Sequence, residues 1–147
     1  MSNSLRTAAA CAALFFLSGA PVSAADSDQP AQPVPLDSET VLAGIPVACT
    51  GIGQTKQDPK WAAYPVRLEF ANPKHEYLAD EVVTLYDGGR PRFTMSCEGP
   101  WVLMTLPAGK GFKVEAMVRH PMRGPVSATV KAPKHGQTRF VLTFPNE

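Results

Sequence analysis

Two thioethers and one imidazole stand close together in the run Met117-Val118-Arg119-His120-Pro121-Met122. Soft thioether and imidazole ligands suit copper. The run also has a plainer interpretation, because Met117 shares a strand parity with charged residues and His120 stands beside a proline in an expected turn. We therefore predict no metal and no cofactor, and keep a copper site at Met117, His120 and Met122 as the alternative.

Four aromatic residues lie outside the alternating strand positions that are expected to form the core, namely Trp61, Tyr64, Tyr77 and Tyr86. Their amphipathic rings combine apolar area with a polar handle, as surfaces that bind sugars or peptides do. The sequence leaves two interpretations open for them. They form a ligand or partner surface, or they pack under the long loops that carry them.

Cys49 and Cys97 are the two cysteines that remain once an N-terminal signal containing Cys11 is removed. Each shares its strand parity with apolar residues, so both thiols are expected to point into the core. In an oxidising compartment such a pair predicts a disulfide. A redox-active or metal-binding pair would favour CxxC spacing, which this chain lacks.

Motifs of common catalytic sites are missing from the sequence, including GxSxG, HExxH and a glycine-rich phosphate loop. Removing Arg6 with the signal takes the 14 basic residues to 13, against 13 acidic residues. No basic stripe is present, so the electrostatic footprint of a nucleic-acid or anionic-membrane partner is absent. We predict a protein that is not an enzyme and does not bind nucleic acid.

Changes in amino-acid composition along the chain divide it into three expected segments. Residues 1–24 are typical of a secretory signal peptide, with Arg6 before an apolar run too short to span a bilayer. Residues 25–43 are polar and interrupted by prolines, which predicts a flexible leader. Residues 44–147 are long enough for one modest core. The expected location is periplasmic or secreted, without a membrane span.

The folded part is organised around residues 90–116, where three strand-like runs are separated by two turns. The middle run, residues 101–106, is apolar on both parities and predicts a central strand covered on both faces, with Trp101 in the core against Phe93, Phe112 and Val114. The flanking runs alternate and are expected to be half-buried. Turns at 98–100 and 107–111 predict a β-meander.

Further strands are expected around this stretch. Residues 41–50, 64–71, 78–86, 126–131 and the last run before the C-terminus have strand patterns, and Asp87-Gly88-Gly89 is a strong hairpin signal. Lys56–Ala63 predicts at most one helical turn around Trp61. About eight short runs at ten-residue spacing predict an all-β, antiparallel Greek-key sandwich of seven to eight strands.

The runs YLADEVVTLYDGGR and CEGPWVLMTLPAGKGFKVEA resemble carboxypeptidase regulatory-like, or transthyretin-like (prealbumin-type), β-sandwich domains over about forty residues. The matching positions are turn residues and core apolars, so the resemblance implies a fold more than an activity. Enzymes among these relatives end in a Tyr-Arg-Gly-Ser tetrapeptide, whereas this chain ends Thr143-Phe144-Pro145-Asn146-Glu147. We expect a non-catalytic module that binds a protein partner in the cell envelope, with carbohydrate or small-ligand binding as the alternative.

Overall fold

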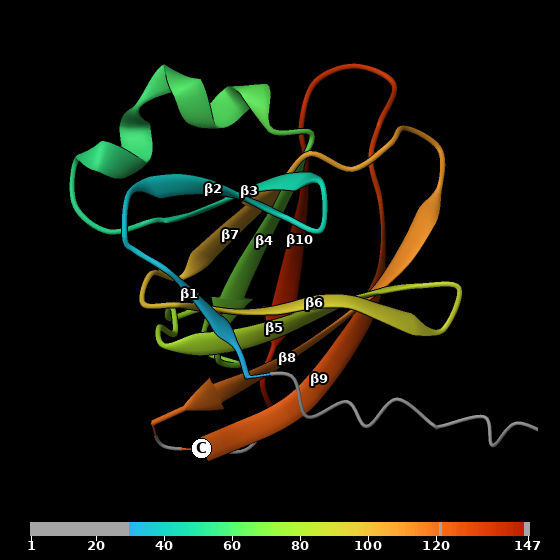
Figure 1. Ribbon diagram of the computed structural model, residues 1–147. Helices are drawn as coiled ribbons and strands as arrows, with labels where there is room; N and C mark the ends of the chain where they lie inside the picture. The colour runs from blue at the N-terminus through green and yellow to red at the C-terminus, as the bar shows by residue number, and fades with distance from the viewer. Residues whose placement is uncertain (1–29, 121, 146–147) are drawn as a thin grey trace, which may run out of the picture.

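The computed structural model describes residues 30–120 and 122–145, which form two five-stranded sheets packed face to face (Figure 1). Sheet A contains, in spatial order, β1 (Gln32–Val34), β6 (Arg90–Cys97), β5 (Glu81–Asp87), β8 (Gly111–Arg119) and β9 (Met122–Lys131). Sheet B contains β10 (Thr138–Thr143), β4 (Val66–Ala71), β7 (Trp101–Met104), β3 (Ile45–Thr50) and β2 (Ser38–Leu42). The predicted all-β sandwich is confirmed.

The number and direction of strands differ from the prediction. Ten strands are present among the described residues, rather than seven or eight. Two outer strands pair in parallel, β1 with β6 and β10 with β4, whereas the other pairs are antiparallel. Short runs such as Gln32–Val34 carry too few residues for an alternating pattern to be recognised.

Alternating side chains build the core between the sheets. On β4, for example, Val66, Leu68 and Phe70 are buried in the core. The intervening Arg67 belongs to the opposite face. The same alternation holds on β10, where Leu142 is buried and Phe140 packs against the core, and it continues to the buried Phe144 just after the strand.

Strand β7 occupies the centre of sheet B, and all four of its residues are buried. The predicted central strand is therefore confirmed. The predicted meander is wrong, because β6 and β8 belong to sheet A while β7 belongs to sheet B. The turns on either side of β7 carry the chain from one sheet to the other. Gly99 is needed in the first, since a Cβ there would lie 2.3 Å from the Thr50 carbonyl oxygen.

The predicted flexible leader over residues 25–43 is corrected by β1 and β2, which lie within it. Val34 and Leu42 are buried there, so two apolar residues anchor an otherwise polar segment. The predicted signal peptide, residues 1–24, and residues 25–29 lie outside the described residues. The single strand expected over residues 41–50 is instead the β2–β3 hairpin, which turns at Ala43 and Gly44, both with positive φ.

A crossover joins β3 to β4 over the outer face of sheet B. Both strands pair antiparallel with β7, which lies between them, so they run parallel to each other. The chain from 51 to 65 must therefore return from one end of the sheet to the other. It contains the short 3₁₀ helices η1 (Thr55–Gln57) and η2 (Pro59–Ala63), so the helical turn around Trp61 is confirmed.

The predicted disulfide between Cys49 and Cys97 is present and links the two sheets, from β3 to β6. The Cα atoms lie 5.5 Å apart, within the usual range for this bond. Both cysteines are buried. Cys97 Sγ also lies 3.1 Å from the Gly99 carbonyl oxygen, which is a close contact rather than a hydrogen bond because a disulfide sulfur carries no proton.

One buried carboxyl group stands among the core residues of sheet A. Glu81 is fully buried, on the same strand parity as Val83 and Leu85, and is paired with Cys97 on one side and Val118 on the other. Neither carboxyl oxygen has a hydrogen-bond partner on another described residue. Burial disfavours the charged form and raises the pKa of Glu81 to about 9. The group is therefore neutral at pH 7.

Removing the disulfide should destabilise the fold. We expect the double substitution of Cys49→Ala and Cys97→Ala to lower the free energy of unfolding by about 4 kcal/mol, because the bond closes a long loop in the unfolded chain. Denaturant unfolding of residues 25–147, without the predicted signal peptide, measures the change. An unaltered unfolding midpoint would show that the bond contributes nothing to stability.

Glu81 should make stability depend on pH. Its pKa is higher in the folded than in the unfolded protein, so its contribution is fully present below about pH 4.5 and is lost as the pH rises to about 9. Because of this group, we expect the free energy of unfolding to be up to about 5 kcal/mol higher at pH 5 than at pH 9. Glu81→Gln should remove that difference, whereas Glu98→Gln at an exposed position should keep it. Equal pH profiles for wild type and Glu81→Gln would refute the assignment.

Candidate functional site

The four aromatic residues predicted as a binding surface do not come together. Trp61 and Tyr64 are buried in a second small core with Ala48 and Leu103, between the crossover and the outer face of sheet B. Tyr86 belongs to β5 in sheet A, where the Lys113 ammonium lies 5.1 Å from its ring centroid. Tyr77 alone is largely exposed, at 47%. The packing interpretation is therefore correct for Trp61 and Tyr64.

Polar contacts hold the crossover in place. The Trp61 indole Nε1 donates to the Thr55 carbonyl oxygen at 2.7 Å, and the Tyr64 hydroxyl donates to Glu39 Oε2 at 2.9 Å. Burial, together with the hydrogen bond to Glu39 and its charge, raises the pKa of Tyr64 to about 12. Gln137 Nε2 donates to the carbonyl oxygens of Trp61 and Tyr64. These contacts hold the crossover against the part of the outer face of sheet B that contains Ala48 and Leu103.

Trp101 lies on the other part of this outer face. The prediction that it is buried is confirmed, at 8% exposure, but the predicted neighbours are wrong. Its ring and that of Tyr77 form a T-shaped pair with 6.2 Å between centroids, and the Arg67 guanidinium lies over the Trp101 ring, 4.5 Å from its centroid. Trp101 is paired with Glu69 on β4 and so shares its face, away from the core between the sheets.

We define the Trp101 cluster as five residues on this face, Arg67, Glu69, Tyr77, Trp101 and Arg139. Glu69 is its centre and is fully buried. Glu69 Oε2 accepts from the Tyr77 hydroxyl at 3.0 Å and lies 2.6 Å from Arg139 Nη2. Glu69 Oε1 lies 2.9 Å from Arg67 Nε, an ion pair without the alignment of a hydrogen bond.

The charges of the cluster do not cancel. Two guanidinium groups share one carboxylate, which leaves a net positive charge at the surface. The hydrogen bond and charge of Glu69 raise the pKa of Arg139, whose side chain is 54% exposed. Val141, paired with Glu69 on β10, is also exposed. The cluster therefore offers positive charge, an aromatic ring and aliphatic surface, held by a buried carboxylate.

Sequence reasoning missed most of this cluster. In the sequence, Arg67 and Glu69 alternate with the core residues of their strand, and charged residues on a solvated face carry no functional signal. Their significance arises from β10 pairing beside β4, which brings Arg139 level with Arg67. A parallel pair between strands 72 residues apart in register has no local sequence signature. Only the unusual Trp at the start of β7 was a usable signal.

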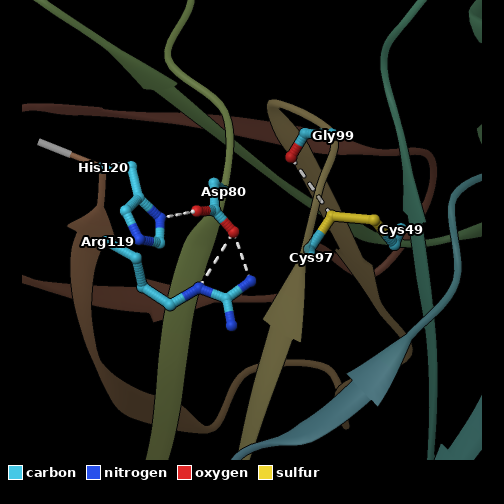
Figure 2. A network of polar contacts seen from close by, with 6 residues as sticks. All are labelled: Cys49, Asp80, Cys97, Gly99, Arg119 and His120. Carbon is cyan, nitrogen blue, oxygen red and sulfur yellow. Dashed lines mark hydrogen bonds and ion pairs between the residues drawn. A yellow bond between two sulfur atoms is a disulfide. The ribbon is translucent and has the colours of Figure 1, made fainter.

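The copper alternative predicted His120 as a metal ligand, whereas in the structure the His120 side chain contacts Asp80. His120 Nδ1 lies 2.6 Å from Asp80 Oδ2, and Arg119 donates from Nε, at 2.9 Å, and from Nη2 to the other Asp80 oxygen (Figure 2). The hydrogen bond from His120 is the largest of the effects that lower the pKa of Asp80, and Arg119 adds to it. Asp80 itself has φ of +69°.

The methionines of that alternative lie on neighbouring strands. Met117 belongs to β8 and is partly exposed, and Met122 begins β9 and is 76% exposed. Within residues 30–120 and 122–145, no group of three His, Cys, Asp or Glu side chains is placed to hold a metal ion. His120 is instead paired with Asp80 (Figure 2).

Trp61 should contribute to stability rather than to binding. We expect Trp61→Ala to cost about 3 kcal/mol in free energy of unfolding, because it empties the small core under the crossover. Trp61→Phe should cost about 1 kcal/mol, through the lost hydrogen bond to Thr55. Urea unfolding of both variants, with Ile52→Ala as an exposed control, tests this. A neutral Trp61→Ala would mean that the crossover does not pack on the sheet.

Comparison with known proteins adds no assignment to this geometry. No helix of the described part of the chain is long and apolar enough to cross a membrane. The family named from the sequence remains an expectation, with which the all-β architecture agrees. No protein-family model matches the chain, and no curated protein matches it significantly.

Proposed function

We propose that this protein is a non-catalytic, exported binding module that engages a protein partner in the cell envelope through the Trp101 cluster. The observation that carries the proposal is the buried Glu69 carboxylate, which holds Arg67 and Arg139 beside Trp101 and Tyr77. Arginine, tyrosine and tryptophan are the residues most enriched where protein interfaces concentrate their binding energy.

Preorganisation favours this use of the cluster. An exposed arginine normally loses side-chain entropy when a partner orders it. Here Arg139 is held at 2.6 Å by Glu69, and Arg67 is stacked on the Trp101 ring. A partner therefore meets side chains that are already fixed. The excess positive charge favours a partner with an acidic group at the matching position.

Export is supported by the disulfide and by the signal-like N-terminus. The Cys49–Cys97 bond persists in oxidising compartments such as the periplasm or the extracellular space. The absence of catalytic motifs in the sequence supports a binding role over an enzymatic one.

Site-specific photo-crosslinking in the cells that make the protein tests the proposal. A photoreactive residue replaces Val141, beside the cluster, and in a matched control variant it replaces Lys113, an exposed strand residue of sheet A. We expect one discrete adduct from position 141 and none of that mass from position 113. Adding Arg139→Ala should abolish the adduct without lowering the melting temperature much, because that side chain is half exposed.

Two results would contradict the proposal. The first is the same adduct pattern from both positions, or no adduct from position 141. The second is an adduct from position 141 that persists with Arg139→Ala and with Tyr77→Ala, since the cluster would then contribute nothing to the interaction.

A further inference from the structure

Over residues 126–130, strand β9 has no neighbouring strand on one side of its backbone among the described residues. It is the last strand of sheet A, has ten residues and pairs only with β8 (Figure 1). In an antiparallel pair, alternate residues direct both their N–H and C=O groups away from the neighbouring strand. An edge of this length is therefore a row of donors and acceptors that another strand can fill.

The usual protections of an edge strand are missing from its second half. Gly124 and Pro125 interrupt β9 near its start, and charges stand at Arg123 and Lys131. The five residues between Pro125 and Lys131 carry no charge and no proline. By contrast, β1 at the other edge of the sheet is only three residues long. Short strands, prolines and charges are what keep natural edges apart.

Core residues under this edge are incompletely covered. Val126 and Ala128 on β9 are partly exposed and pack against the core, as does Phe140 on β10. Ser127 and Thr129 lie on the opposite face of β9 and are exposed. A strand added beside β9 would extend sheet A and cover Val126 and Ala128.

The sequence of this half, Val126-Ser127-Ala128-Thr129-Val130, reads almost the same in both directions by side-chain type. We propose that a second copy of this protein pairs antiparallel along β9, centred on Ala128, so that the two A sheets become continuous. Val126 then faces the partner's Val130 and Ser127 faces the partner's Thr129. Such an arrangement has the self-complementarity that a two-fold interface requires.

Each cross-strand pair is favourable by type. The valine pair lies on the core side, where β-branched residues stabilise paired strands, and the Ser–Thr pair can form a hydrogen bond on the outer side. Lys131 faces the partner's Pro125, so no like charges are opposed. The contact is small, which implies a dimer of weak affinity. It uses another face than the Trp101 cluster and stands independently of the proposed function.

Charge substitutions at the exposed pair test the register. Sedimentation equilibrium of the wild-type protein without the predicted signal peptide, from about 5 µM to about 1 mM, should show a reversible monomer–dimer equilibrium, since weak contacts fall in this range. The variant with Ser127→Lys and Thr129→Lys opposes lysines across the two-fold and should remain monomeric. The variant with Ser127→Glu and Thr129→Glu should do the same.

Two complementary combinations separate this pairing from general effects of charge. An equimolar mixture of the lysine and glutamate variants should form a heterodimer, because each lysine then faces a glutamate. A single chain with Ser127→Lys and Thr129→Glu should dimerise with itself. Thermal unfolding of every variant confirms that the fold is retained, since both positions are exposed.

The following results would overturn the inference. A wild-type protein that stays monomeric to about 1 mM, the weak end of this affinity range, has no such interface. A lysine variant that dimerises like wild type uses another surface. A mixture that remains monomeric, or a Lys–Glu single chain that does, shows that the strands do not meet antiparallel around Ala128. Binding of an unrelated extended peptide at β9 by a monomeric wild-type protein would likewise assign the edge to a different occupant.

Discussion

The burial of β7 on both faces is the constraint on which the rest of this structure depends. Its four residues pair with β3 on one side and β4 on the other, so every hydrogen-bonding direction and both side-chain directions are filled by protein. Val102 and Met104 face the core between the sheets. Leu103 and Trp101 face outward and require a second covering layer.

That second layer divides the outer face of sheet B in two. The crossover from β3 to β4 covers Leu103 with the aromatic side chains of Trp61 and Tyr64, so this part of the face is buried by apolar packing. Trp101 is covered instead by Arg67 and Tyr77, around the buried Glu69. An ion-pair network is a costly way to cover a tryptophan, because charges lose hydration on burial. In the proposed function, these same polar groups contact the partner.

The two buried glutamates illustrate how surroundings decide the state of a carboxyl group. Glu69 has two arginines and a tyrosine within bonding distance, and these compensate the charge. Glu81 lies among apolar residues without a hydrogen-bond partner on another described residue, so the neutral form prevails. Glu81 shares the inward parity of Val83 and Leu85, so the sequence contained a signal for it. Glu69 gave none, because it stands among outward residues of its strand.

Local patterns in the sequence predicted the strands, the inward parities and the disulfide, because alternation and cysteine usage act within or between clearly marked runs. They did not predict which sheet each strand joins. The turns beside β7 look like hairpin turns, yet they carry the chain between sheets, a choice made by tertiary packing. For the same reason, the sequence predicted Trp101 among Phe93 and Phe112. It did not predict the Trp101 cluster, whose residues come from β4, β7 and β10 together with Tyr77.

Hydrogen exchange at the β7 amides tests the central claim most directly. If both faces of β7 are covered by the core and by the outer layer, the protected amides of residues 101–104 can exchange only when the whole protein unfolds. Their free energy of exchange should then equal the free energy of unfolding measured with denaturant under the same conditions. Exchange of these amides through a local opening, at a clearly lower free energy, would contradict a doubly covered central strand.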